Sequence, residues 1–396
     1  MGVHIPQFPV TVVGSWPRSR EVLRALREKR SSRMTQEEFD RVTGQAILDC
    51  VRLQEQAGVD IVTDGEQRRD NFISFVAERL ENVQMLTVAE LLDYVEDKTG
   101  FEEILGTLDV PAYSLSNPAA VGKIRRARPL ALDDYLFLQK HTEKAVKVAL
   151  PGPYLLTRSM WVEGLSQSTY PTKEELATDV VRVLREELEE LIQAGVDFVQ
   201  LDEPVLTELV FTQKNAHRTF MCGALTAKAD AEQELEFAVD LISQVTRGMT
   251  QRGTRLGVHV CRGNWSTHED VLLRGPYQPL ASYLARLPVD QLVLEYATPR
   301  AGDMTALASF EHMEIGLGVV NPRTDWVESP EDIVAKVRTA LSYVQPSQVF
   351  LNPDCGFGTF SQRPMNDVSR AVDKLRACAE AAQALRQTYA AIVREV

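Results

Sequence analysis

The stretch TKEELATDVVRVLREELEELIQAGVDFVQLDEP, residues 172–204, contains one complete repeat of the fold that we predict for the whole chain. Thr172, the early glutamates and the periodic Leu and Val predict a capped amphipathic helix that stops at Gly195. The run DFVQLDEP then predicts a buried strand that ends in carboxylates. Residues 35–66 follow the same plan, and both helices enter the next strand through the same four letters, AGVD.

Short runs rich in Val, Ile and Leu recur along the rest of the chain, separated mostly by helical patterns. Most of the runs are continuous rather than alternating, which is typical of strands buried on both faces of a parallel sheet. Strand and helix in alternation predict an α/β fold, a (β/α)8 TIM barrel, with residues 1–396 forming a single domain. The eight runs span residues 10–14, 59–66, 146–153, 197–204, 256–261, 291–296, 314–320 and 348–356.

The gap between the second and third runs is too long for one helix. We therefore expect residues 67–145 to contain an insertion or extension, such as a small hairpin or subdomain. A doubly wound open sheet is the alternative fold. That fold usually carries a glycine-rich phosphate fingerprint after its first strand, and VVGSWPRS at 12–19 is not one.

Composition excludes several classes of function. With 43 basic and 56 acidic residues the formal net charge is −13, which argues against broad binding to nucleic acid or to an anionic membrane. No apolar run approaches the roughly 18–20 residues of a spanning helix. The start MGVHIPQFPV lacks the features of a secretory signal. Five scattered cysteines favour reduced thiols over a disulfide framework, so we expect a cytoplasmic protein.

Soft metal ligands stand at the ends of three predicted strands. His259 and Cys261 are two residues apart, so both side chains point to the same side of one strand end. Glu295 and Cys355 follow two later strands, and a barrel brings all carboxyl ends to one mouth. Two thiolates, an imidazole and a carboxylate suit zinc, and a site in the mouth suits a catalytic zinc.

Each of these residues also has an ordinary structural interpretation. A single His-x-Cys pair is more often core packing, because Cys is among the most buried residue types. Glu295 alone could be a helix-capping or ion-paired carboxylate, and Cys355 could be incidental. Their coincidence at three strand ends favours the metal site. The carboxylates of the 197–204 run need a cationic partner, which could be a substrate ammonium or an arginine.

The strand-end motifs together resemble the C-terminal catalytic barrel of cobalamin-independent methionine synthase, over nearly the whole chain. The motifs are VVGSWPRS, DGEQRRD, VQLDEPVL, VHVCRGNW, VLEYATPR and NPDCGFGT. The resemblance implies a zinc-dependent transfer of a methyl group to the sulfur of homocysteine, in which the substrate thiolate is the nucleophile. It implies zinc ligands at His259, Cys261, Glu295 and Cys355, and amino-acid contacts at Val13, Ser15, Glu66 and Asp202.

The methyl-donor side departs from the family pattern. Arg323 stands where the family has a proton-relay histidine, and Asn321 stands where it has an aspartate. The tryptophan that flanks the donor falls on Arg158, with Trp161 near it. We assign Arg158, Trp161 and Arg323 to the donor side and leave the general acid unassigned. The chain also has one barrel, whereas many members of the family have two.

These departures leave the donor open between methyl-folate and a methylated corrinoid, with a corrinoid protein as a possible partner. The single barrel is similar to the "core" type of the family. Three alternatives remain: an alkyltransferase for another thiol, as in epoxyalkane:coenzyme M transferases; a metal-free decarboxylase on a related barrel; and a non-catalytic protein that handles zinc or a corrinoid. The four soft ligands argue against the decarboxylase.

Overall fold

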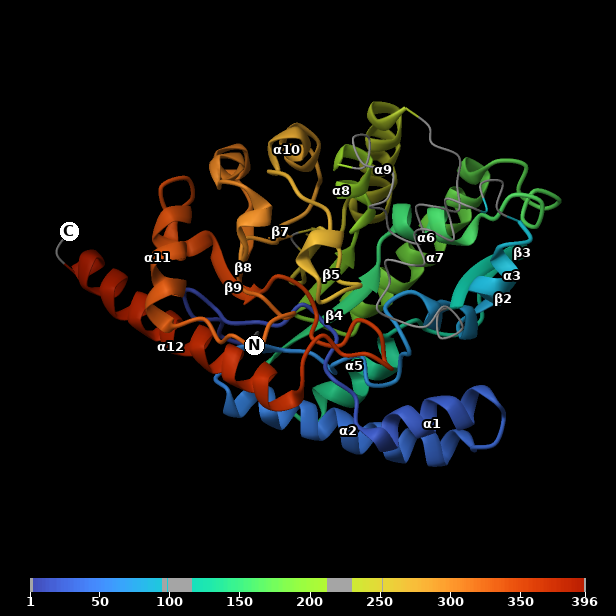
Figure 1. Ribbon diagram of the computed structural model, residues 1–396, viewed down its shortest axis with the longest axis horizontal. Helices are drawn as coiled ribbons and strands as arrows, with labels where there is room; N and C mark the ends of the chain where they lie inside the picture. The colour runs from blue at the N-terminus through green and yellow to red at the C-terminus, as the bar shows by residue number, and fades with distance from the viewer. Residues whose placement is uncertain (1–2, 95–97, 99–115, 212–229, 251, 395–396) are drawn as a thin grey trace.

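The computed structural model describes residues 3–94, 98, 116–211, 230–250 and 252–394. Seven parallel strands form its central sheet, with helices packed around them (Figure 1). In spatial order the strands are β1 (Ile61–Val62), β4 (Ala145–Pro151), β5 (Phe198–Asp202), β6 (Arg255–Val260), β7 (Gln291–Leu294), β8 (Glu314–Val320) and β9 (Val349–Pro353). Nearly every residue in these strands is buried, as the continuous apolar runs predict.

A short N-terminal segment joins the two edges of this sheet. Val10 pairs in parallel with Leu351 of β9, and Thr11 pairs in parallel with Ile61 of β1. The backbone N–H of Thr11 donates to the carbonyl of Leu351 at 2.9 Å. Each of the eight predicted runs overlaps one of these eight segments, so the predicted TIM-barrel fold is confirmed.

Helices connect the strands and cover the outside of the sheet. Both helices that precede an AGVD sequence begin as predicted, because the hydroxyl of Thr35 accepts from the N–H of Glu38 and that of Thr172 from the N–H of Glu175. The α-helices of the barrel are α1 (Arg20–Arg30), α2 (Gln36–Gln56), α5 (Leu132–Gln139), α6 (Pro153–Met160), α7 (Lys173–Gln193), α8 (Val205–Phe211), α9 (Ala231–Thr246), α10 (Gln278–Leu284), α11 (Pro330–Ala340) and α12 (Val368–Arg394).

Residues 67–145 hold a second, two-stranded sheet. Strand β2 (Leu80–Thr87) pairs antiparallel with β3 (Ser116–Arg126), and this pair lies to the side of the barrel in Figure 1. Short helices precede and follow β2: the 3₁₀ helix η1 (Ser74–Glu78) and α3 (Val88–Leu91). Residues 95–97 and 99–115 of this predicted insertion lie outside the described residues.

The last helix, α12, stabilises the N-terminal segment that closes the barrel. The guanidinium of Arg386 in α12 donates to the carbonyls of Gln7 at 2.6 Å and Phe8 at 3.1 Å, and pairs with Asp60 at 2.6 Å. Figure 1 shows α12 in red beside α2 in blue, and the two helices contact each other. In the part of the chain that the structure describes, no helix has the length and apolar character to cross a membrane.

Candidate metal and thiol site

Three of the four predicted metal ligands meet at the carboxyl ends of the strands. His259 is in β6, Cys261 directly follows it, and Cys355 follows β9. One ligand atom of each lies within 4.8 Å of the other two, and all three residues are buried. Four described cysteines, these two included, are free thiols. Two sulfurs and one imidazole nitrogen are the donor set that zinc prefers.

A chain of hydrogen bonds runs from the barrel interior to His259. Nδ1 of His259 lies 3.1 Å from Oδ1 of Asp202, which also accepts from the Gln200 amide at 2.8 Å. The ammonium of Lys147, fully buried in β4, donates to Oε1 of Gln200 at 3.3 Å. A carboxylate bonded to a ligating histidine fixes the orientation of its ring.

Burial and mutual contact shift the pKa values of this group. The Cys355 thiol donates a hydrogen bond to the sulfur of Cys261. This hydrogen bond, together with neighbouring His259, lowers the pKa of Cys261 to about 5. Burial lowers the pKa of His259, but Cys261 and Asp202 outweigh it and raise that pKa to about 10. A thiol that ionises readily is suited to metal binding.

Glu295, the fourth predicted ligand, is not part of this group. It follows β7 and is fully buried, but its carboxylate faces arginines. Oε1 pairs with Arg300 and lies 3.4 Å from Nη2 of Arg323, while Oε2 accepts from the backbone N–H of Arg262 at 2.8 Å. Burial raises the pKa of Glu295, and the arginines outweigh it, so the net pKa is below the usual range.

Arg323, predicted on the donor side, is an internal ion-pair partner. Its side chain is 0% exposed and pairs with Glu269 at 2.9 Å and Glu295 at 3.4 Å. Nη1 donates to Oδ1 of Asn264 at 3.2 Å. Asn321 donates to Glu269 as well, at 2.9 Å. The position that the family resemblance places next to the donor is thus occupied by a residue that binds carboxylates inside the protein.

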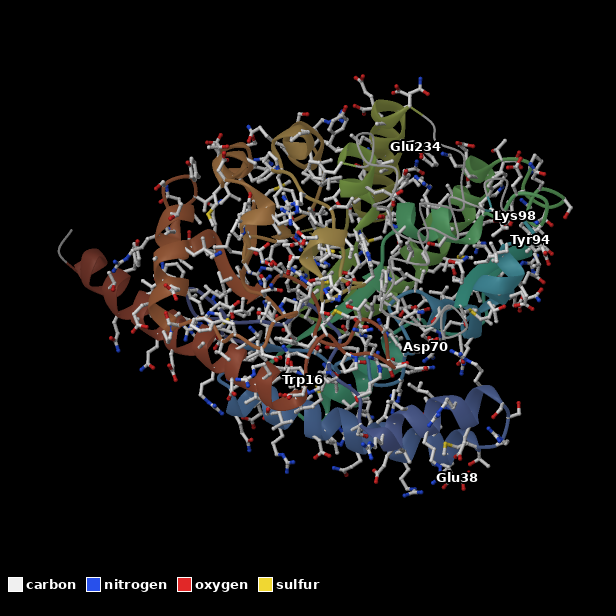
Figure 2. All side chains as sticks on the ribbon, in the orientation of Figure 1. Trp16, Glu38, Asp70, Tyr94, Lys98 and Glu234 are labelled. Carbon is white, nitrogen blue, oxygen red and sulfur yellow. The ribbon has the colours of Figure 1, made fainter. Side chains whose placement is uncertain are left out.

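The other two donor-side predictions, Arg158 and Trp161, lie at the end of α6. The Arg158 guanidinium donates to the Tyr154 hydroxyl at 2.7 Å and lies 3.8 Å from the carboxylate of Glu234. Figure 2 labels Glu234 on α9, toward the top of the view. The indole N–H of Trp161 donates to the carbonyl of Tyr170 at 3.0 Å. Arg158 and Trp161 are not among the described residues that line the pocket of the predicted metal ligands.

The predicted amino-acid contacts do lie in that pocket. Val13, Ser15, Glu66 and Asp202 line the same cavity as His259, Cys261 and Cys355. They come from the ends of the 10–14 segment, β1 and β5, on the opposite side of the barrel mouth from β7 and β8. An apolar wall completes the pocket, formed by Phe72, Ile73, Trp265 and Phe360.

Glu66 is a carboxylate in this pocket with one oxygen buried and unpaired in the described structure. It is 3% exposed, has a positive φ of 54°, and its Oε2 has no hydrogen-bond partner within the described structure. Burial raises its pKa to about 7, although Arg69 and Arg18 lower it. A buried carboxylate without a partner is unfavourable, so a bound cation would stabilise it.

Two glycines allow the pocket to close around Ser15 and Glu66. A Cβ on Gly14 would lie 2.4 Å from Oε1 of Glu66, and a Cβ on Gly356 would lie 2.0 Å from the Ser15 hydroxyl. Arg18 holds the same two loops together, since it donates to the carbonyls of Glu66 at 2.8 Å and Gly358 at 2.6 Å. The side chain of Glu66 therefore packs directly on the backbone of Gly14, and that of Ser15 on the backbone of Gly356.

Glu203, next to Asp202, has a structural role. Its carboxylate accepts from the N–H groups of Tyr154 at 2.8 Å and Leu155 at 2.9 Å, at the start of α6. This is favourable at the positive end of a helix. Burial still raises the pKa of Glu203 to about 8. Of these two adjacent carboxylates, Asp202 at the end of β5 lines the pocket and Glu203 does not.

Sequence reasoning missed the residues that orient the site. Gln200 and Lys147 are polar residues within apolar runs, and the alternation of side chains along β5 places Gln200 on the same side as Asp202. That signal was available. No comparable signal pointed to Glu269 or Arg300. They lie in the short 3₁₀ helices η4 (Glu269–Val271) and η5 (Pro299–Ala301) and reach the site only through the fold.

Comparison with known proteins places the chain in one family. The family model described as "Cobalamin-independent synthase, Catalytic domain" matches residues 8–383. A methionine synthase of Thermococcus kodakarensis is 28% identical over 363 residues, which are 91% of this chain and 90% of that protein. A 5-methyltetrahydropteroyltriglutamate–homocysteine methyltransferase of Thermosynechococcus vestitus is 28% identical over 387 residues, 97% of this chain but 44% of that protein.

The fold has solved counterparts as well. The structure of a B12-independent methionine synthase from Shewanella sp. W3-18-1, in complex with selenomethionine, superimposes with a TM-score of 0.73 at 22% identity. The match covers 98% of this chain and 100% of that one. A second structure, from Listeria monocytogenes, gives a TM-score of 0.67, also at 22% identity, and covers 96% of this chain and 99% of that chain. At this identity the likeness establishes the shared fold.

Proposed function

The chain belongs to the cobalamin-independent methionine synthase family, and on that premise we propose that it is a zinc-dependent enzyme that transfers a methyl group from a methylated folate to homocysteine. One observation carries the proposal. His259, Cys261 and Cys355 come together in the same pocket as Glu66 and Asp202. A thiol-binding group and an ammonium-binding group therefore lie together, as an amino acid with a thiol side chain requires.

The residues present fit a zinc ion. Two sulfurs and one imidazole nitrogen, all buried and within 4.8 Å of one another, would hold it. When bound there, zinc would lower the pKa of the substrate thiol and favour the nucleophilic thiolate. Asp202 would keep the His259 ring in place through its bond to Nδ1.

The amino acid end of the substrate would be held by the opposite side of the pocket. Glu66, whose Oε2 lacks a partner, would pair with the ammonium group, and Asp202 would share that charge. Ser15 and the backbone near Val13 would bind polar atoms of the same end. These contacts orient the sulfur toward the three metal ligands and so supply part of the rate enhancement.

The sequence leaves the methyl donor open between a methylated corrinoid and a methyl-folate, and of the two we propose the folate. The matching family is described as cobalamin-independent, which argues against a corrinoid donor or a corrinoid protein partner. The name of the Thermosynechococcus relative includes a methylated tetrahydropteroyl donor, and the apolar wall of Phe72 and Phe360 suits a flat aromatic ring. Since Arg158 and Arg323 are engaged within the protein, we assign donor contact to this wall instead.

The test is an assay of methionine formation from homocysteine. We expect product with methyl-tetrahydrofolate in its mono- or triglutamyl form, none with methylcobalamin, and loss of product after zinc is removed with dipicolinate. Added zinc should restore activity. Full activity in zinc-free protein, methylation from methylcobalamin alone, or alkylation of coenzyme M in preference to homocysteine would each contradict the proposal.

A further inference from the structure

A second cavity lies outside the pocket of the predicted metal ligands and shares no described lining residue with it. Its volume is about 460 Å³, within the range of small-molecule sites. Residues of α1, α2, η1 and α5 contribute to its wall, on which three aromatic rings lie: Phe39, Phe75 and Phe137. Figure 2 labels Asp70, the residue that directly follows Arg69 of this wall. An aromatic wall of this kind suits a flat organic group.

Basic side chains outnumber acidic ones on the wall of this cavity, five to four. Three of the arginines pair with carboxylates of the same wall. The pairs are Arg68 with Asp134 at 2.6 Å, Arg79 with Asp133 at 3.7 Å, and Arg128 with Glu78 at 3.7 Å. These pairs leave two cations and one carboxylate, so the described wall carries one positive charge in excess. A bound monoanion would neutralise that charge.

Arg69 is the buried cation of this wall that lacks a carboxylate. It is 4% exposed, its Nη1 donates to the carbonyl of Ala149 at 2.8 Å, and its Cζ lies 4.2 Å from the centre of the Phe75 ring. Among the residues that the structure describes, its Nε has no hydrogen-bond partner and no carboxylate lies within ion-pair distance of it. A buried charge without a counter-ion is unfavourable. An anion in the cavity would supply the missing partner.

We propose that this cavity binds a small organic monoanion in which a carboxylate is attached to a flat apolar group, and that the carboxylate pairs with Arg69. Ala149 engages one of the five N–H groups of the guanidinium, so within the described structure donors remain for an anion. The planar guanidinium matches the geometry of a carboxylate. The phenylalanine rings of the wall contact the apolar part of the ligand. This ligand is distinct from homocysteine, whose proposed pocket has a different wall.

Benzoate is the probe for this site, and benzamide, which has the same ring without the charge, is the matched neutral control. Isothermal titration calorimetry of the zinc-loaded full chain measures both. We expect one benzoate to bind per chain, and benzamide to bind at least about tenfold more weakly, because it cannot form charge-assisted hydrogen bonds with Arg69. The benzoate affinity should be the same after zinc is removed, since the cavity contains none of the predicted metal ligands.

Arg69→Met should weaken benzoate binding by about tenfold or more, because the carboxylate loses its charged partner. Arg41→Met is the control, since Arg41 is an exposed arginine of α2 outside this cavity, and it should leave the benzoate affinity unchanged. Circular dichroism and the melting temperature check that each variant is folded. Arg79→Met carries the test if Arg69→Met does not fold. Its side chain is 15% exposed, and loss of its charge should weaken benzoate binding by about threefold or more.

Several results would overturn the inference. They are the absence of benzoate binding at millimolar concentration, equal affinities for benzoate and benzamide, and an unchanged benzoate affinity in folded Arg69→Met or, in its place, Arg79→Met. Loss of benzoate binding when zinc is removed, or displacement of benzoate by homocysteine, would also overturn it, because the probe would then occupy the pocket of the predicted metal ligands. The methionine assay tests the proposed function separately, so the two can fail independently.

Discussion

Oδ1 of Asp202 lies 3.1 Å from Nδ1 of His259, so one carboxylate both contacts a proposed metal ligand and lines the pocket proposed for the substrate. The two residues are register partners on neighbouring strands β5 and β6. Their contact is therefore built into the sheet rather than into a loop. This rigidity suits a residue that holds a metal-binding imidazole at a fixed angle.

Replacing Asp202 by Asn should weaken zinc binding by about 10–100-fold, because the amide no longer fixes His259 as a carboxylate does. The measurement is a competition titration against a chelator. Glu66→Gln is the matched control, since Glu66 lines the same pocket, is not among the hydrogen-bond partners of His259, and should leave zinc affinity unchanged. Equal zinc affinities of Asp202→Asn and wild type would contradict the assigned role.

The pH dependence of homocysteine use should report the ionisation of Glu66. Burial raises its pKa to about 7, so the carboxyl is largely protonated below that pH and cannot pair with the substrate ammonium. We expect kcat/KM for homocysteine to rise as pH increases from 6 to 8. In Glu66→Gln the step attributable to this group should disappear, leaving only the titration of the substrate thiol.

The same shift has an effect on stability with a definite sign. The folded protein holds the Glu66 proton up to a pKa of about 7, whereas the ordinary value is 4.5. Between these values the folded state binds more protons than the unfolded state, so stability falls as pH rises. Chemical denaturation should show wild type losing stability relative to Glu66→Gln across that window. If the difference in the free energy of unfolding between wild type and Glu66→Gln is the same at every pH, the raised pKa of Glu66 is refuted.

Gly14→Ala should impair the substrate pocket. Its Cβ would lie 2.4 Å from Oε1 of Glu66 and 3.3 Å from the Cβ of Ala149, so the carboxylate must move. We expect a loss of about 1–3 kcal/mol in the free energy of unfolding and a higher KM for homocysteine. Gly44→Ala is the control. Gly44 is in helix α2, and an added Cβ there would come no closer than 3.4 Å to the ring of Phe137. The substitution should therefore leave the free energy of unfolding unchanged or raise it by up to about 1 kcal/mol.

Tyr277→Phe should destabilise the protein. The hydroxyl of Tyr277 donates to the carbonyl of Val260 at 2.5 Å and accepts from the N–H of Glu295 at 2.9 Å, and so joins the ends of β6 and β7. Its loss leaves two buried backbone groups unsatisfied, at a cost of about 1–3 kcal/mol. Tyr283→Phe, on the half-buried face of α10, should leave the melting temperature nearly unchanged. Equal melting temperatures for both variants would contradict this role.

The fold was predictable because its signals are local. Each strand of a parallel barrel is buried on both faces, so runs such as those at 256–261 and 291–296 are visible without any partner. The convergence of His259, Cys261 and Cys355 followed from one rule, that the carboxyl ends of parallel strands share one mouth.

The partners of charged side chains were not predictable in the same way. Its position along the chain predicts that Arg323 contacts the donor, yet its contact with Glu269 of η4 depends on how two connections, far apart in the sequence, fold over the barrel. Whether a carboxylate such as Glu295 faces a metal or an arginine depends on rotamers and on cations that the sequence does not place nearby.

The closure of the barrel by Val10 and Thr11 has a consequence for biosynthesis. The ring is completed only when Leu351 is available, and Cys355 lies just beyond it. A nascent chain that has emerged only as far as β8 therefore carries His259 and Cys261 without the third ligand or the pocket wall at Gly356. Such closure is a contact between the two ends of the chain and is slow to form. The proposed zinc site is accordingly complete only after Cys355 has been synthesised.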